Sequence, residues 1–177
     1  MRKNKQYSKL PEAIAAGMFL VTCIPALYAQ STSVNTTDFC AVVKEPQRFD
    51  GQTITVRARV QSDGTHGSLI YDESCSDRGV TLFVFPNAKG SDQLDAALSW
   101  CHRTTRGKLI LGNFTGVFHF KPIVLGDQIF ADINVSRIDD IVLKSTKTTS
   151  ATFPTPCPEA PSIESLVEQS KKKNRQN

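Results

Sequence analysis

The sequence predicts a mainly β protein with one or two short helices, in which three strands, a helix and two more strands follow one another. Apolar and polar residues alternate over 53–61 and again over 129–135, which is the period of a half-buried strand. Between these segments, apolar residues recur at helical spacing after Ser91. The chain has 177 residues, and the 148 that follow residue 29 suit one domain of ordinary size with a substantial core.

The first expected elements are a short helix over 39–46 and a turn at 49–51. Thr37 or Asp38 can accept hydrogen bonds at the N-terminus of this helix. The turn contains an Asp-Gly pair, which is a common turn signal. The apolar residues of the helix share one face: Phe39, Val42 and Val43.

A strand over 53–61 and a shorter one over 68–71 are expected to form a hairpin. Asp63-Gly64 between them is a typical hairpin turn. Arg57 and Arg59 belong to the polar face of the first strand. Its opposite face carries four apolar residues: Ile54, Val56, Ala58 and Val60.

The next segments are a polar loop over 72–79, a third strand over 80–85 and a helix that Ser91 caps. Pro86 is expected to end the strand because proline cannot donate to a strand ladder. The basic segment 103–107 ends in glycine, which is a helix stop signal. The apolar residues of the helix follow helical spacing: Leu94, Ala97, Leu98 and Cys101.

Two strands complete the predicted domain. The fourth spans 108–120, where Gly112 and Gly116 mark bulges or sharp bends. A loop over 122–127 separates it from the fifth strand over 129–135. Three residues extend the apolar pattern beyond that strand: Ile138, Ile141 and Val142.

This order of elements resembles the OB-fold, a small five-stranded barrel with a helix between its third and fourth strands. The segment 49–60 looks like the first strand of OB domains of the anticodon-binding-like type, where a Gly-x-x-Val-x-Val-x-Gly pattern is common. Ala58 replaces the glycine that lets that strand coil, so we expect a smaller bend. The segment 114–118 resembles the strand after the helix. The resemblance covers 38–143 and is strongest to small exported bacterial proteins; it implies this OB-like barrel and no particular activity.

Residues 1–29 have the three-part layout of a secretory signal peptide. A basic head precedes an apolar run over 13–26, and a small residue follows at Ala29, where cleavage is expected. A polar, flexible leader over 30–37 comes next. Two alternatives stay open. The apolar run could remain as a membrane anchor, although it is shorter than the ~20 residues that span a bilayer. The chain could also be lipidated at Cys23, although the threonine before it fits such a site poorly.

Four cysteines follow the expected cleavage site: Cys40, Cys75, Cys101 and Cys157. An even number in an exported chain predicts two disulfides, for which three pairings are possible. We favour Cys40 with Cys75, which leaves Cys101 to pair with Cys157 and to tie the tail to the domain. The sequence contains no Cys-x-x-Cys pair, which disfavours a zinc knuckle or a thioredoxin-like redox site.

The formal net charge of +4 comes from the two ends of the chain. Residues 30–143 include 11 basic and 13 acidic side chains, so this part carries about −2. A nucleic-acid-binding domain normally has a basic surplus, because neutralising phosphates supplies most of its affinity. The segment 144–177 is expected to be a flexible or disordered arm rich in Thr, Ser and Pro, with a short helix over 162–169 and a basic run at 171–173.

The sequence carries no recognisable catalytic or metal-binding motif. His66, His102 and His119 share no metal-ligand spacing. His102 follows Cys101 directly, and adjacent helix side chains point about 100° apart, which disfavours a nucleophile and base pair. The acidic cluster 72–77 lacks the register of a known calcium loop. We therefore expect no enzyme activity, no metal site and no cofactor.

Binding is the function that remains. OB barrels bind oligonucleotides, oligosaccharides or peptides on the face of strands two and three and on the flanking loops. The resemblance places five side chains near that face: Arg57, Arg59, Tyr71, Phe83 and Phe85. Alternation leaves open whether these phenylalanines or the residues between them form the core, and whether the arginines only cover a strand.

We therefore expect a periplasmic or secreted, non-catalytic domain that binds a cell-envelope component or a protein partner. One alternative is an OB domain for single-stranded nucleic acid, which the charge of the central region opposes. Another is a structural envelope protein that uses its tail for anchoring. Contact with a membrane is expected only through an uncleaved or lipidated N-terminus.

Overall fold

The computed structural model describes residues 35–75, 79–101, 104–105, 107–122, 130–146 and 157–175, all within the compact unit Ser33–Asn177. The expected signal peptide over 1–29, its cleavage after Ala29, the lipidation alternative at Cys23 and the leader as far as residue 34 lie outside the described residues.

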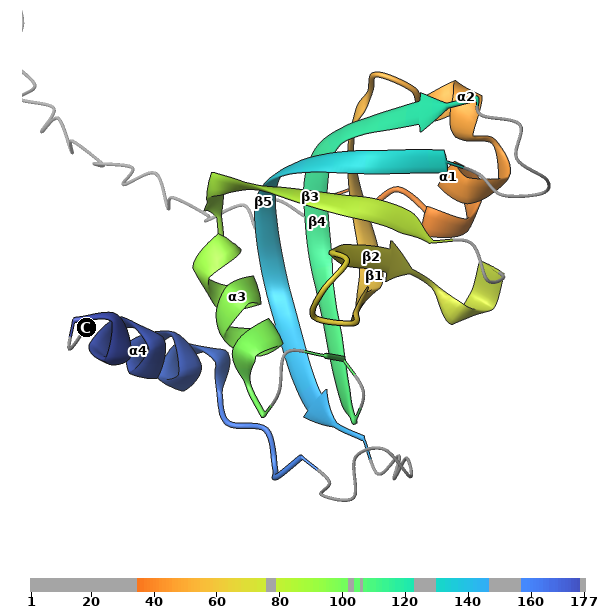
Figure 1. The fold of residues 1–177 in the computed structure, drawn as a ribbon. Coiled ribbons are helices and arrows are strands. Elements are labelled where there is room, and N and C mark those ends of the chain that lie inside the picture. The colour runs from red at the N-terminus through yellow and green to blue at the C-terminus, as the bar shows by residue number, and fades with distance from the viewer. Residues whose placement is uncertain are drawn as a thin grey trace, which may run out of the picture. The chain divides into compact units, whose positions relative to one another are not determined.

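The described part of the chain is mainly β, as the sequence predicts, with five strands in one sheet and short helices (Figure 1). The elements follow in this order: α1 Phe39–Lys44, α2 Pro46–Phe49, β1 Thr53–Ser62, β2 Ser68–Tyr71, a 3-10 turn Glu73–Cys75, β3 Val80–Lys89, α3 Ser91–Ser99, β4 Lys108–Lys121, β5 Phe130–Ser145 and α4 Ile163–Asn174.

The strands are hydrogen-bonded in the order β1-β2-β3-β5-β4, and the sheet closes because β4 also pairs with β1. The β3–β5 pair is parallel, and the other four pairs are antiparallel. The long strands β4 and β5 run beside each other, while α3 packs against β3 and β5, and α4 packs against α3 (Figure 1). The helix α3 therefore connects β3 to β4 and covers one side of the sheet.

Alternation places the apolar residues inside, as predicted for β1, where Ile54, Val56, Ala58 and Val60 are all buried. The two largest fully buried side chains, Phe114 and Phe118, are on β4, and β4 and β5 also bury Ile110 and Ile133. Burial of such a side chain contributes about 1.5–3 kcal/mol, so these strands hold much of the stabilising apolar area. The helix α1 adds one buried face: Phe39, Val42 and Val43.

Two glycines let β4 bend, as the sequence predicts. The β4–β5 register shifts beside Gly112 and again at Gly116. A Cβ atom on Gly116 would overlap the backbone of Asn134, so the close approach of β5 requires glycine there. Gly112 is paired with the buried Ala58, so β4 and β1 both carry a small residue at this position of their ladder.

Several element boundaries differ from the prediction. β3 continues through Pro86 to Lys89, because its β5 register shifts after Val84 and the proline falls in that irregular stretch. Gly90, with φ of 81°, caps α3 in place of Ser91, which is the first helical residue. β5 reaches Ser145, since the apolar pattern beyond the predicted strand pairs with the first half of β4.

Part of the segment expected to be a flexible arm packs on the domain. The predicted boundary at residue 143 lies within β5. Helix α4 begins after Ser162, whose side chain accepts a hydrogen bond from the Ser165 amide, and it is longer than the predicted 162–169. Its residues Ile163 and Leu166 are buried against the domain. Residues 147–156 lie outside the described residues.

Both favoured disulfide pairings are confirmed. Cys40 bonds Cys75 with a Cα–Cα distance of 5.1 Å, and Cys101 bonds Cys157 with a Cα–Cα distance of 5.8 Å. The first joins α1 to the segment after β2, and the second joins the end of α3 to the segment before α4. Two disulfides indicate an oxidising environment.

Candidate binding face

Three large apolar side chains are exposed on two neighbouring strands. Leu69 on β2 is 40% exposed, and Phe83 and Phe85 on β3 are 52% and 50% exposed. Each follows or precedes a buried or half-buried residue, because successive side chains of a strand point to opposite sides of the sheet. The neighbours Ile70 and Leu82 fill the interior, which answers the question that alternation left open. The phenylalanines belong to the outer surface.

A groove of about 400 Å³ lies beside two of these side chains, Leu69 and Phe83. Leu69, Phe83 and Phe130 give it apolar walls. Lys121 and Asp132 give it a polar end. Strand register brings these residues together from four elements, since β2 pairs with β3, β3 with β5, and β5 with β4.

The polar end of the groove is an ion pair. The Lys121 ammonium lies 2.8 Å from Oδ2 of Asp132. The Asp132 side chain is only 8% exposed, whereas that of Lys121 is 60% exposed. A nearly buried carboxylate needs such a partner, because an unpaired buried charge is costly. The groove therefore has apolar walls, and the two charges at its polar end are paired with each other.

The two arginines of the predicted site are bound within the chain. Arg57 donates a hydrogen bond of 3.0 Å to Oδ1 of Asn113, which in turn donates one of 2.8 Å to Asp140. Arg59 forms an ion pair with Glu73. Arg59 and Tyr71 are paired across β1 and β2. This pair borders the face, whereas Arg57 faces β4 on the other side of β1.

Of the five predicted site residues, the structure therefore places Phe83 in the groove, with Phe85 two residues farther along β3. The sequence reasoning missed the other groove residues, above all Leu69, Lys121 and Asp132. A signal existed for Asp132, because it alternates with apolar residues on the fifth strand and so points outward. Its proximity to Leu69 depends on strand order.

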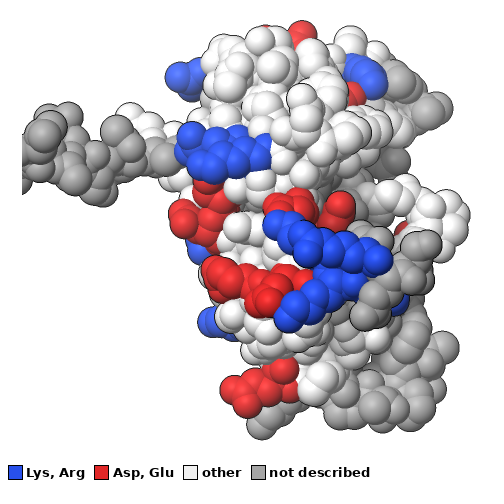
Figure 2. Space-filling model, turned by 90° about the vertical axis from the view of Figure 1, so that its left-hand side faces the viewer, with Lys and Arg blue, Asp and Glu red and all other residues white. Residues whose placement is uncertain are grey.

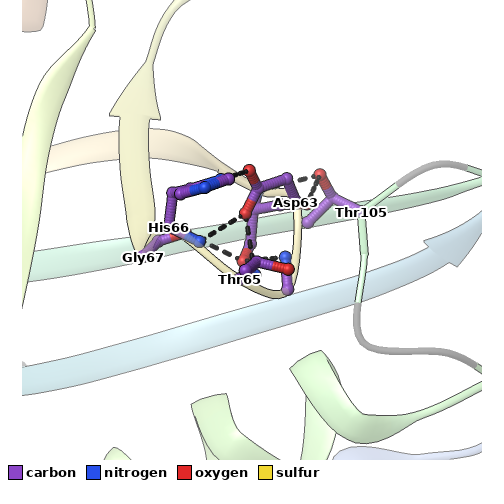
Figure 3. A network of polar contacts seen from close by, with 7 residues as sticks. Asp63, Thr65, His66, Gly67 and Thr105 are labelled. Atoms are coloured by element: carbon purple, nitrogen blue, oxygen red, sulfur yellow. Dashed lines mark hydrogen bonds and ion pairs between the residues drawn. The ribbon is translucent and has the colours of Figure 1, made fainter.

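The hairpin loop between β1 and β2 is held by a polar network (Figure 3). Oδ1 of Asp63 accepts hydrogen bonds of 2.8 Å from the amides of Thr65 and His66, and its Oδ2 lies 2.5 Å from Nδ1 of His66. These hydrogen bonds, led by those from His66, lower the pKa of Asp63 well below its ordinary range. Thr105 ties the loop to the segment before β4 through the Ser62 backbone.

The remaining candidates for chemistry are two histidines and a cluster of two cysteines with an aspartate. His119 is half-buried on β4 opposite Asp132, and His102 lies outside the described residues. Cys40, Asp72 and Cys75 bring potential metal ligands within 4.8 Å of one another, but the disulfide occupies both sulfur atoms. The Asp72 carboxylate accepts hydrogen bonds from the Ser74 side chain and amide, which lower the pKa of Asp72.

Charge is mixed on the face that carries α3 and α4. Figure 2 shows Lys and Arg side chains interleaved with Asp and Glu side chains there. Ion pairs account for part of this arrangement, including Lys171 with Asp92 at 3.4 Å and Lys172 with Glu168 at 2.7 Å. Among the described residues, the charges on this face therefore form no continuous basic surface for a polyanion.

Comparison with protein-family models, with curated proteins and with solved structures finds no match to this chain. Among the helices of the described residues, none combines the length and apolar character needed to cross a membrane.

Proposed function

We propose that the protein is an exported, non-catalytic binding domain that holds a protein partner against the outer face of β2 and β3. The observation that carries this proposal is the pair of half-exposed phenylalanines, Phe83 and Phe85, of which Phe83 lines an apolar groove. Exposed clusters of large apolar side chains mark interaction sites on soluble proteins. Aromatic anchors of this kind supply much of the energy of protein interfaces.

The strand order supports an OB-like domain. The strands close in the order β1-β2-β3-β5-β4, and α3 lies between β3 and β4 in the chain, which is consistent with the resemblance to the OB-fold. In that fold the face of strands two and three is the binding face. The exposed residues Leu69, Phe83 and Phe85 lie on these two strands.

Two features support export. The disulfides Cys40–Cys75 and Cys101–Cys157 are stable in an oxidising compartment. Residues 1–29 have the layout of a cleavable signal peptide, with Ala29 at the expected site. The proposed destination is the periplasm or the cell exterior.

A protein partner fits the face better than single-stranded nucleic acid does. Nucleic-acid binding requires free cations along the phosphate path. Here Arg57, Arg59 and Lys121 are each engaged with a partner in the chain. The groove is mostly apolar, which favours apolar side chains as ligands. Anchoring through a free tail is also less favoured, because α4 packs against α3.

Site-specific photo-crosslinking in the native host tests this function. A benzophenone amino acid replaces Phe83 in one variant and Lys44, which is exposed on α1, in the control. We expect a discrete protein adduct from position 83 and none from position 44. Excess wild-type protein should compete for that adduct, whereas a Phe83→Ser/Phe85→Ser variant should not.

Equal adducts from both positions, or no protein adduct from position 83, would overturn the proposal. Titration of a labelled oligothymidylate across salt concentrations provides the comparison with nucleic acid. Micromolar affinity that falls steeply with salt would favour the nucleic-acid alternative.

A further inference from the structure

The second half of β3 has a strand edge that β2 does not cover. The β2–β3 ladder comprises three residue pairs and ends where Ser68 faces Leu82. β3 nevertheless continues to Lys89. Among the described residues, no strand pairs with β3 on its β2 side beyond Leu82. The exposed stretch from Phe83 to Asn87 follows directly, interrupted only by the half-buried Val84.

An uncovered strand edge presents backbone N–H and C=O groups that can pair with another extended chain. The sheet closes where β4 pairs with β1 and with β5, and this closure leaves the β2 side of β3 beyond Leu82 unpaired among the described residues. β5 pairs with β3 on the opposite side, with Val84 facing Val135. The strand that carries the uncovered edge is therefore held in place on its other side by its pairing with β5.

The exposed side chains along this edge have the spacing of an extended polypeptide. Phe83 and Phe85 are two residues apart on one strand and point to the same side. Two residues of a β-strand span about 6.6–6.8 Å. A second extended chain places every other side chain at this same interval. Its alternate apolar side chains can therefore contact both rings and enter the groove beside Phe83.

The charged groups around the groove are already paired within the chain, which favours an uncharged, apolar segment as the ligand. Lys121 is paired with Asp132, and Arg59 with Glu73. A charged ligand group would have to compete with these intramolecular pairs and lose its hydration. An apolar ligand side chain leaves both pairs intact.

Pro86 sets the length of the available edge. Proline has no N–H group and is tolerated on edge strands where its nitrogen faces solvent. A partner strand can therefore pair with the segment 83–85 and not much farther. Such a short ladder also limits uncontrolled pairing between copies, since proline is a common means of blocking edge-to-edge association.

We infer that the β3 edge at 83–85 binds an extended segment of a partner protein by strand addition, with apolar side chains at alternate positions over Phe83 and Phe85. This inference rests on the proposed binding function and names the kind of partner. Backbone hydrogen bonds provide affinity in this mode, and alternate side chains provide specificity.

The test uses the full chain labelled with ¹⁵N and three capped seven-residue peptides. The first alternates leucine and threonine. The second has the same sequence but N-methylated backbone amides, which removes hydrogen-bond donors and keeps the side chains. The third has the same composition with its leucines adjacent. Chemical shifts of the amides of Phe83, Val84 and Phe85 report binding at the edge.

We expect the alternating peptide to shift these three amides, and the other two peptides to bind at least tenfold more weakly. Equal binding of the N-methylated peptide would overturn strand addition. Strand addition would also be overturned if the alternating peptide at millimolar concentration shifted none of these amides. If crosslinking at Phe83 still succeeded in that case, the proposed binding function would stand without this inference. Sedimentation is measured for the wild type and for Phe83→Ser/Phe85→Ser. Self-association that is lost in this variant would identify a second copy of the chain as the occupant and would overturn the inference of a partner protein.

Discussion

The Lys108 ammonium donates a hydrogen bond of 2.8 Å to the carbonyl oxygen of Trp100, just beyond the end of α3. It also donates to the carbonyls of Ala97 at 3.0 Å and Leu98 at 2.6 Å. The last carbonyls of a helix lack partners within the helix and carry its negative dipole end. A cation on the first residue of β4 thus closes the C-terminus of α3 while being 4% exposed.

Replacement of this cation should destabilise the protein. We expect Lys108→Met to lower the free energy of unfolding by about 2–3 kcal/mol, because buried carbonyls lose their donor. Urea unfolding followed by circular dichroism measures the change. Lys44→Met, on the exposed side of α1, is the matched control and should change stability by less than about 0.5 kcal/mol. Equal effects of the two substitutions would contradict the capping role.

The same residue makes stability depend on pH at the alkaline end. Burial lowers the pKa of Lys108 from 10.5 to about 8. Between these values the unfolded chain binds a proton that the folded chain has released, so stability rises with pH. Above pH 8, we expect the free energy of unfolding of the wild type to rise relative to that of Lys108→Met by up to about 1.4 kcal/mol per pH unit. A relative loss would show that the three carbonyls hold the proton more strongly than burial expels it.

Gly116 should resist substitution more than Gly112 on the same strand. A Cβ atom at Gly116 would overlap the Asn134 backbone, whereas one at Gly112 would lie 3.4 Å from the Phe114 ring. We expect Gly116→Ala to cost about 1–3 kcal/mol through forced backbone shifts. Gly112→Ala should stay within about 1 kcal/mol of the wild type. Thermal unfolding compares the pair, and a reversed order would refute the close β4–β5 approach.

The single tryptophan of the chain reports the packing of α4. Trp100 is 9% exposed and packs with Leu166 of α4 and with Cys157. A Cys101→Ser/Cys157→Ser variant loses the constraint on a 56-residue separation, which is worth about 4 kcal/mol in the chain-entropy estimate. We expect that loss together with a red shift of tryptophan fluorescence.

The other disulfide provides the control for this experiment. A Cys40→Ser/Cys75→Ser variant removes a bond of sequence separation 35 at the opposite end of the fold. It should lose a similar amount of stability without a red shift under native conditions. A red shift of the same size in both variants would show that fluorescence reports general loosening rather than the α3–α4 contact.

The phenylalanines of the proposed binding face should contribute little to folding. Phe83 and Phe85 are half-exposed, so we expect serine at either position to change the free energy of unfolding by less than about 1 kcal/mol. Leu82→Ala, at the buried neighbour, should cost about 2–5 kcal/mol. Unfolding in guanidinium measures all three. A large loss in the phenylalanine variants would assign them to the core.

Much of the fold follows from local sequence signals. Alternation located β1, and helical spacing after Ser91 located α3. Glycines located the irregular points of β4. Each signal depends on residues that are near in sequence. The extension of β3 through Pro86 did not follow, because a change of register with β5 accommodates the proline and that partner is distant in the chain.

The candidate site was less predictable for the same reason. Phe83 and Phe85 could be named, but their direction depended on which alternating set filled the interior. The groove requires Leu69 on β2 to lie near Lys121 on β4, a neighbourhood created by the β3–β5 pairing. The arginines looked available in the sequence, yet Asn113 on β4 engages Arg57 and Glu73 in the 3-10 turn engages Arg59. Sequence patterns show a residue's face, whereas its neighbours depend on strand order.

The bond between Cys101 and Cys157 also governs what proteolysis can remove. A single backbone cut anywhere between these two residues leaves both pieces covalently joined. Helix α4, whose Ile163 and Leu166 are buried, therefore stays with the fold after such a cut. A nicked molecule would run as one species without reductant and as two fragments with it. In a compartment rich in proteases, this bond makes damage to the connecting segment survivable.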